Sequence, residues 1–233
     1  MIEPVSGDRV AIAVGQISSL IRDNQLKAGD KLPSEATLTD SLNVSRTVIR
    51  EALRSLAAMR LVDLGVGKRP TVAELDDSSI AMTFRHGVTT DQIDIRQIYD
   101  ARRTIEARTA SLAALRRSDE EAIQIIAHAR AMQNSLDRPE VVMEHDLALH
   151  TAIAKASRNP VFALIIGAFR GVIVESWPIG WKARSSDVER DAMNQLHLDL
   201  AEAISAGNPL VAASMMERHF DLSLKALAVA GLT

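Results

Sequence analysis

The sequence predicts a mainly α-helical protein, with a small β-hairpin in its N-terminal third and an all-α antiparallel helical bundle after it. Apolar residues recur every three or four positions through most of the 233 residues, as they do along one face of a helix. Hydrophobic residues make up 47% of the sequence, but aromatic residues make up only 3%. The unbranched side chains that dominate lose little freedom in a helix, so the composition also favours helices over sheets.

The N-terminal elements begin and end at residues suited to helix caps and turns. Ser34 and Ser45 can each cap the start of a helix, because a serine hydroxyl accepts a bond from the first backbone N–H groups. Asn43, between those two helices, suits a left-handed turn position. The expected helices lie at 8–25, 34–42 and 45–60.

A hairpin should follow the third helix. The short runs "LVDL" and "TVAEL" flank "GVGKR", which gives two strands and a basic tip with two glycines. We expect residues 1–75 to form one domain and residues 76–93 to be a linker, with a short helix near 80–84.

Beyond the linker, residues 94–233 should form a helical bundle. Asn-Pro pairs at 159–160 and 208–209 mark sharp breaks before new helices. Short connections imply antiparallel neighbours. The helices are expected at 94–116, 118–136, 139–156, 160–178, 186–206 and 208–229.

Charge and composition limit the kinds of partner and metal site that the protein can have. The formal net charge is −3, yet residues 45–70 hold six basic and two acidic residues, which suggests an anionic partner for that segment. Cysteine is absent, so disulfides and thiolate metal sites are excluded. No apolar run of about 18 residues and no signal sequence appear, so we expect a cytoplasmic protein without a membrane partner.

The two short helices joined by a tight turn predict a helix-turn-helix. The first turns of its second helix carry groups that can contact bases or phosphates in the major groove of DNA. Lys68 and Arg69 at the hairpin tip could reach the DNA backbone, and the glycines beside them allow a close approach. A small helical domain with a solvated basic face is the alternative. The recognition-helix candidates are Ser45, Arg46, Thr47 and Arg50.

This region resembles the winged helix-turn-helix of GntR-family bacterial transcription regulators. The resemblance lies in "LPSE", "VSRTVIREAL", "LRSL" and "GVGKRPTV". It implies that the four recognition-helix residues contact operator DNA, with Gly67 and Lys68 at the wing. Ala36 departs from the family, many of whose members have a DNA-contacting arginine there, which leaves the operator sequence open.

Four polar residues interrupt the apolar faces of three bundle helices. Asp146 and His150 lie one turn apart on such a face, and His197 and His219 occupy similar positions in later helices. An unpaired charge in a core is costly, so something must satisfy these groups. Imidazole and carboxylate together suit a divalent ion such as Zn, Ni, Mn, Fe or Co. Taken singly, each histidine is better explained as a hydrogen-bonded core residue.

The other histidines fit this set less well. His145 lies one position off the apolar face, where it should meet solvent or support the ligands from outside. His128 stands alone in its helix, and His86 falls in the expected linker.

Arg102 interrupts another apolar face, and Glu106 follows one turn later. Two interpretations stay open: an internal ion pair, or an arginine that faces a cavity and holds an anionic ligand. Trp177 and Trp181 would either close such a pocket or pack at a subunit contact.

The bundle resembles the FCD ligand-binding domain of the fatty-acid-regulator subgroup of GntR proteins. The matching pieces are "DARRTIEARTASLAAL", "HDLALHTAIAKASRNPVF", "HLDLAEAISAGNP" and "MMERHF". The resemblance implies one divalent metal per subunit, Zn first, held by Asp146, His150, His197 and His219. It implies that Arg102 contacts the effector, an organic acid or sugar acid.

Together these features predict a homodimeric, metal-containing, effector-responsive transcription regulator, a repressor rather than an activator and not an enzyme. A two-fold dimer calls for a near-palindromic operator. The alternatives are a regulator that senses the metal ion itself, and a metal-dependent hydrolase or lyase with an accessory basic domain.

Overall fold

The structure is a computed structural model that describes residues 6–231. The chain divides into two compact units, Met1–Ser79 and Ile80–Thr233. Each unit has its own apolar core, and each is mostly helical. The prediction of a mainly α protein with one small hairpin is confirmed.

The first unit is built from three helices and a short hairpin. Ile17, Leu38 and Leu53 lie in its core, and both α1 and α2 pack against α3. The buried side of α3 is apolar, which leaves the other side of that helix to solvent. The elements are α1 (Ser6–Asp23), α2 (Glu35–Leu42), α3 (Arg46–Ala58), β1 (Val62–Asp63) and β2 (Thr71–Val72).

The turn between α2 and α3 has the predicted caps. The Ser34 hydroxyl accepts a bond from Thr37 N at 3.1 Å, and the Ser45 hydroxyl accepts one from Val48 N at 3.4 Å. Asn43 has a positive φ of 53°, a conformation that asparagine tolerates better than most residues. The caps and the left-handed turn therefore fix where α3 begins.

The hairpin pairs its strands in an antiparallel register, with Val62 opposite Val72. Gly67 in the connecting loop has a φ of +69°, which an L-residue with a side chain rarely adopts. Arg69 does not point away from the unit as a phosphate ligand would. Its Nε and Nη2 donate to the backbone oxygen of Leu32 at 2.8 and 2.5 Å, so Arg69 holds the base of the hairpin in place.

Residues 76–93 are more ordered than a linker. Helix α4 (Ser78–Thr89) is longer than the short helix expected near 80–84. Phe84 packs against Phe169 with ring centroids 4.7 Å apart, and Val88 and Ile93 also pack on the core of the second unit. Apolar residues in this segment therefore attach it to the bundle, a contact that local sequence pattern does not reveal.

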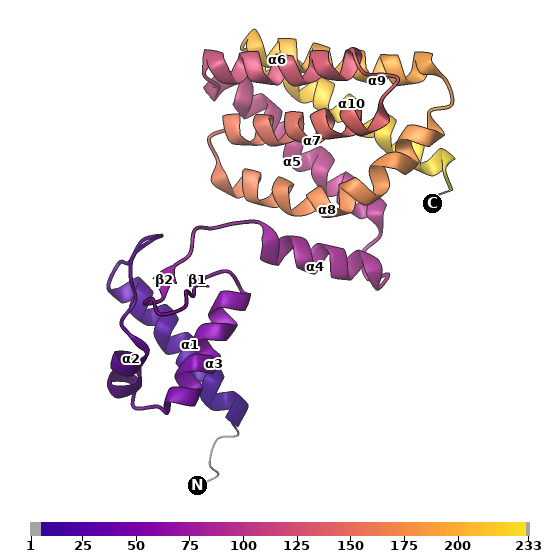
Figure 1. Ribbon diagram of the computed structural model, residues 1–233. Helices are drawn as coiled ribbons and strands as arrows, with labels where there is room; N and C mark the ends of the chain where they lie inside the picture. Colours follow the sequence, from indigo (N-terminus) through magenta and orange to yellow (C-terminus); the bar gives the residue numbers. More distant parts are fainter. Residues whose placement is uncertain (1–5, 232–233) are drawn as a thin grey trace. The chain divides into compact units, whose positions relative to one another are not determined.

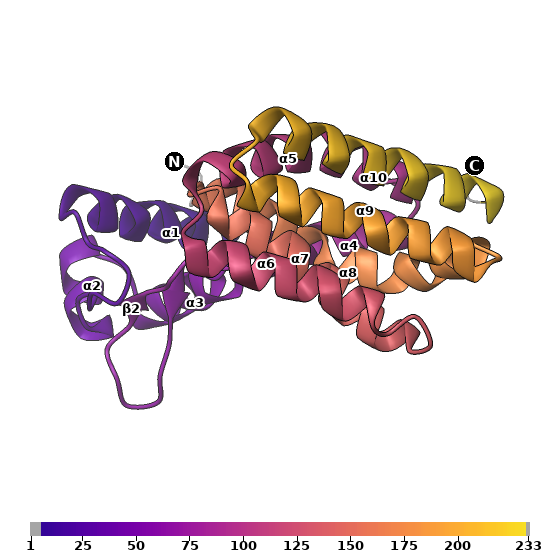
Figure 2. The same ribbon diagram turned by 90° about the horizontal axis from the view of Figure 1, so that it is seen from above.

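The second unit is an antiparallel bundle around a central helix. Helix α5 contacts α7, α8, α9 and α10, and its long neighbour α10 lies along it (Figures 1 and 2). Around α5, the other helices follow one another as neighbours, α10 beside α9, α9 beside α6, and α6 beside α7. The bundle helices are α5 (Ile95–Arg116), α6 (Asp119–Gln133), α7 (Pro139–Ala156), α8 (Pro160–Ala183), α9 (Asp187–Ser205) and α10 (Pro209–Val229).

Helix α8 continues past the predicted end at Pro178 and reaches Ala183. Proline lacks the N–H that would bond one turn back, so a helix bends at such a residue, and α8 bends in this part (Figure 1). The extension carries the buried residues Gly180 and Trp181. By length and composition α8 is apolar enough to cross a membrane, but a core helix of a bundle passes the same test.

Candidate functional site

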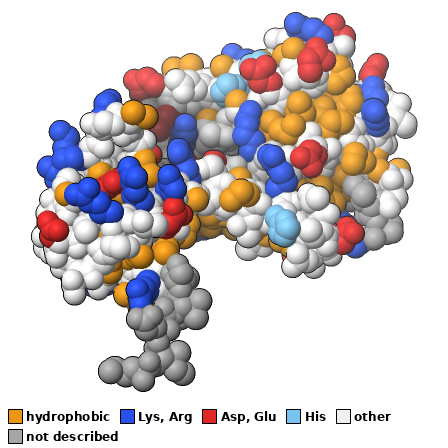
Figure 3. Space-filling view, turned by 60° about the horizontal axis from the view of Figure 1, so that its bottom comes forward, with side chains coloured by type: hydrophobic (Ala, Val, Ile, Leu, Met, Phe, Trp, Pro, Cys, Tyr) orange, Lys and Arg blue, Asp and Glu red, His pale blue; other side chains and the backbone are white. Residues whose placement is uncertain are grey.

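The exposed face of α3 carries the predicted DNA-contacting residues. Arg46, Thr47 and Arg50 are exposed, while Ile49 and Leu53 on the opposite face are buried. Lys and Arg side chains gather on one face of this unit (Figure 3). The first turn of α3 therefore presents donors to an outside partner without using them in the fold of the unit.

The contacts of these residues leave them available to DNA. Arg50 Nε lies 3.1 Å from Glu35 Oε2, and both side chains remain about half exposed, at 64% and 45%. Exposed ion pairs contribute about 0–1 kcal/mol, so a phosphate or guanine can displace Glu35 at little cost. Gly67 and Lys68 at the hairpin tip are exposed as well. Their contacts with DNA stay a prediction.

The second unit brings its four predicted metal-ligating residues together. Asp146 and His150 come from α7, His197 from α9 and His219 from α10. All four are buried, and one potential ligand atom from each lies within 4.8 Å of the others. Residues up to 73 positions apart in the sequence thus converge on one point, which could hold a metal ion.

The donor atoms of this cluster lack the partners that buried polar atoms normally have. His150 Nε2, both ring nitrogens of His197 and His219 Nδ1 are buried without a hydrogen bond. His197 Nε2 lies 2.9 Å from Asp146 Oδ1, but in a direction that does not make a hydrogen bond. Two ligands of one first-row metal ion stand about 3 Å apart. A divalent cation would take one ring nitrogen from each of the three histidines and a carboxylate oxygen from Asp146, so the donor set fits a metal.

Glu106 on α5 supports this cluster from outside. The Nδ1–H of His150 donates to Glu106 Oε2, which leaves His150 Nε2 as the lone-pair nitrogen facing the cluster. Arg102 Nε donates to the other carboxylate oxygen at 2.6 Å. A carboxylate behind a histidine fixes its tautomer and orientation in many metal sites. Glu106 was expected to pair with Arg102 only. Its bond to His150 joins residues 44 positions apart, so local sequence pattern does not reveal it.

The electrostatics of the cluster favour an ionised Asp146 and a neutral His219. Burial alone would raise the pKa of Asp146, but its contacts with His197, His150 and His219 hold that pKa well below the usual range. Burial lowers the pKa of His219 well below its ordinary value, and the neighbouring histidines lower it further. These are the protonation states that metal binding requires.

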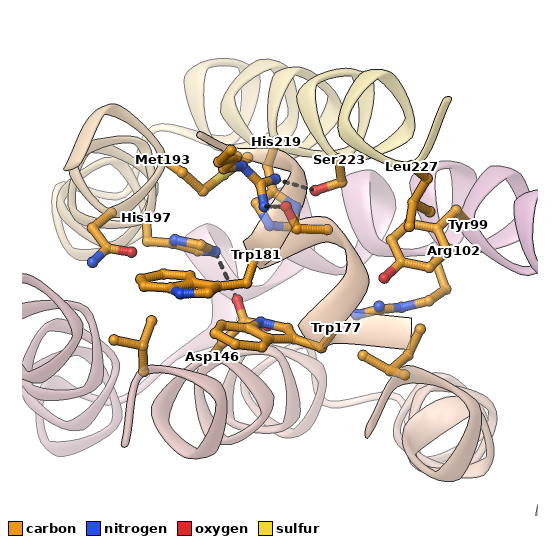
Figure 4. Close-up of a pocket in the computed structure, with 15 residues that line it drawn as sticks. Tyr99, Arg102, Asp146, Trp177, Trp181, Met193, His197, His219, Ser223 and Leu227 are labelled. Atoms are coloured by element: carbon orange, nitrogen blue, oxygen red, sulfur yellow. Dashed lines mark hydrogen bonds and ion pairs between the residues drawn. The ribbon is translucent and has the colours of Figure 1, made fainter. Parts of the chain in front are cut away.

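A cavity of about 40 Å³ adjoins the cluster. The indole rings of Trp177 and Trp181 stack 5.0 Å apart beside the contact between His197 and Asp146, and Arg102 lies next to Tyr99 (Figure 4). The two interpretations of Arg102 are thus compatible, since it forms the internal ion pair and also lines the cavity. Both tryptophans line the cavity too.

Two histidines outside the cluster, each expected to stand apart from the other, form a pair. His128 Nδ1 on α6 lies 3.1 Å from His145 Nδ1 on α7, and burial followed by the charge of His145 lowers the pKa of His128. Each histidine is off the inward face of its own helix, so only the packing of α6 against α7 reveals the pair.

Arg184 is a further residue at the cavity that sequence reasoning missed. It lies just beyond the end of α8, close to the cluster, and lines the same cavity as Asp146 and His219. No helical periodicity marks a residue at the end of a helix. Pro178 was expected to end the helix. Had it been treated as a bend inside a longer helix, the helix would have extended to a point just before Arg184.

Comparisons with known proteins identify the families that the two parts of the chain match. Residues 97–222 match the FCD domain family, and residues 11–72 match the family described as bacterial regulatory proteins, gntR family. The chain is 28% identical over 204 residues to the HTH-type transcriptional regulator LutR of Bacillus subtilis, covering 86% of this chain and 92% of that protein.

Two further similarities extend this result. The chain is 28% identical over 170 residues to the Glc operon transcriptional activator of Escherichia coli K12, covering 71% of this chain and 67% of the relative. Among solved structures, the Streptococcus agalactiae GntR superposes with a TM-score of 0.69 at 22% identity, over 93% of this chain and 99% of that one. This structural likeness shows a shared fold.

Proposed function

This chain belongs to the GntR family of bacterial regulatory proteins and carries their FCD domain, and on that premise we propose that it is a metal-containing repressor controlled by a small organic acid. A transcription regulator of this type follows from the family. The metal, the acid and the sign of control are our proposals. The observation that supports the metal and the acid is the buried Asp146–His150–His197–His219 cluster beside a cavity.

Residues 1–75 form the proposed DNA-binding domain. Arg46 and Arg50 would contact guanines in the major groove from the exposed start of α3. Ser45 and Thr47 would add contacts to phosphates or bases, and Lys68 would contact the backbone from the wing. A homodimer would place two such helices on the half-sites of a near-palindromic operator.

Residues 94–233 form the proposed effector domain. The four-residue cluster would hold one divalent ion, for which zinc is the first candidate. The bound ion would supply positive charge and open coordination positions for an acid. The protein's own residues hold the site ready for it. Glu106 orients His150, and Asp146 stays ionised among the three imidazoles. The effector is a small carboxylic or sugar acid that occupies the cavity, with Arg102 on its wall.

Control would act through a population shift. An acid that binds one conformation of the dimer better than another changes the affinity for the operator by the same coupling free energy. Such couplings are typically about 1–3 kcal/mol, a change of roughly 5–150-fold. We propose that the acid weakens operator binding and so relieves repression. The name of the E. coli relative says activator, so the sign is part of what must be tested.

Nothing at the cluster favours catalysis over sensing. Glu106, the acidic side chain behind His150, is fully buried and engaged by both Arg102 and His150, so it is not free to act as a general base. Glu144, another acidic residue on α7, is exposed, so it does not serve as a general base at the buried cluster either.

The test is a mobility-shift titration of an operator with the zinc-loaded protein and a panel of sugar acids and dicarboxylates. We expect operator binding in the absence of acid and a loss of affinity with one class of acid. Operator binding that responds to a chelator at constant acid, and never to an acid, would replace this proposal with a metal sensor. Conversion of an acid by the metal-loaded protein would replace it with an enzyme.

A further inference from the structure

Arg184 differs from the other arginine on the cavity in what surrounds it. Arg102 is paired with Glu106 at 2.6 Å, so its charge is already neutralised inside the protein. Arg184 forms no ion pair with any carboxylate in residues 6–231. Both line the cavity beside the metal-ligating cluster, but only Arg184 brings an uncompensated positive charge to it.

The hydrogen bonds of Arg184 also leave donors free. Its Nη1 donates to Gly180 O at 3.1 Å, and its Nη2 donates to Ser223 Oγ at a long 3.5 Å. A guanidinium carries five N–H donors in a planar fork that matches a carboxylate. Burial lowers the pKa of Arg184, and the charges of Asp146, Tyr99 and Glu189 offset this only in part.

The position of Arg184 connects the cavity to the surface. Arg184 and Met193 line both the cavity and an outer groove of about 290 Å³, between the end of α8, the start of α9 and the end of α10. Ser223, which Arg184 contacts, lies one turn along α10 from His219. An acid that enters through this groove would therefore meet Arg184 next to the cluster.

We infer that Arg184 is the residue that receives the carboxylate of the effector, with the other oxygens of the effector directed toward the metal-ligating cluster. This inference rests on the proposed function, because it assumes that an acid binds in the cavity. It favours an acid with a carboxylate at one end and a hydroxyl or second carboxylate at the other. Arg102, held by Glu106, shapes the wall of the cavity instead of providing its anion-binding charge.

The two tryptophans of the sequence provide the readout, because Trp177 and Trp181 both line the cavity. The full-length zinc-loaded protein is titrated with L-malate, D-gluconate and D-glucarate while tryptophan fluorescence is recorded. Arg184→Gln should weaken the binding of every acid that the wild type binds by about tenfold or more. Arg184→Lys should recover part of the loss, since it keeps the charge without the fork.

Lys225→Gln is the matched control. Lys225 lines the same outer groove but is exposed, so the same loss of charge there should change acid affinity by less than about twofold. Metal content and operator affinity without acid should be those of the wild type in every variant, which shows that the fold is intact. Equal acid affinity in Arg184→Gln and wild type would overturn the inference. A wild type that responds to none of the three acids, in fluorescence or in operator binding, would overturn the proposed function as well.

Discussion

The two units of this protein place their polar residues in opposite ways. In the first unit the candidate DNA contacts, such as Arg46 and Arg50, stand exposed on a helix whose other face fills the core. In the bundle the candidate sensing residues, such as Asp146 and His197, are buried and turned toward one another. The exposed residues of the first unit are accessible to a large partner such as DNA, whereas the buried residues of the bundle can be reached only by an ion or a small molecule.

The difference has an energetic consequence. Exposed arginines remain hydrated, so they cost the fold little and their loss should leave stability unchanged. Buried imidazoles without hydrogen bonds destabilise the fold unless an ion binds their nitrogen atoms. Variants in the bundle should therefore lose metal or stability, whereas variants on α3 should lose operator affinity with the fold intact.

Removing two ligands should have the largest effect. His197→Ala together with His219→Ala leaves one carboxylate and one imidazole, too few to hold a divalent ion tightly. The metal-to-protein ratio after dialysis, measured by atomic emission, should fall from about one to near zero. His128→Ala with His145→Ala removes the other histidine pair of the bundle and should keep the metal. An unchanged ratio in the first variant would contradict the metal site.

Removing one recognition-helix arginine should have the next largest effect. Arg46→Ala or Arg50→Ala should lower operator affinity by roughly 10-fold or more, because a bidentate arginine–guanine contact contributes about 1–3 kcal/mol. Binding is measured by mobility shift at fixed salt, and thermal unfolding should match the wild type. Arg54→Ala serves as the control, since Arg54 lies further along α3 and pairs with Glu51 at 2.7 Å. Wild-type footprints from both variants would refute the assignment of α3.

Glu106→Gln should weaken metal binding without abolishing it. The variant loses the carboxylate that fixes the tautomer of His150, and outer partners of this kind typically contribute about 10–100-fold to metal affinity. Competition with a chromophoric chelator measures the affinity, and nitrogen NMR of the histidine rings reports the tautomer of His150. A changed tautomer with lower affinity supports the positioning role. Wild-type affinity with an unchanged tautomer would exclude it.

The smallest effect is expected at the wing. Lys68→Ala should weaken operator binding about equally for all sequences and reduce the slope of log affinity against log salt by about 1. Arg69 lies next to it but donates to Leu32 O, so Arg69→Ala should lower thermal stability more than the salt slope. The reverse result would mean that Arg69 contacts DNA and Lys68 does not.

Local sequence features were enough to predict the helices, caps and hairpin of the first unit, but not the long-range bond from Arg69 to Leu32 O. Ser34, Asn43 and Ser45 act on the backbone within three residues of themselves, so their roles follow from the chain alone. The same holds for the helices of the bundle and for the four cluster residues, because burial of a charge on an apolar face already implies a partner.

Other features depend on packing between distant segments. The bond from His150 to Glu106, the pairing of His128 with His145 and the charge of Arg184 at the cavity involve different helices. Helix periodicity gives the face on which a residue lies but not what stands opposite it. Attachment of α4 to the bundle and extension of α8 beyond Pro178 were missed for the same reason.

If the effector acts at the buried cluster and α3 binds the operator, removing the cluster should uncouple operator binding from the acid. Operator affinity of the wild type and of the His197→Ala, His219→Ala double variant is compared with and without an acid that the wild type binds. We expect the acid to change wild-type affinity by roughly 5–150-fold, and the double variant to bind the operator with an affinity that the acid does not change. An undiminished response to the acid in the double variant would contradict this expectation.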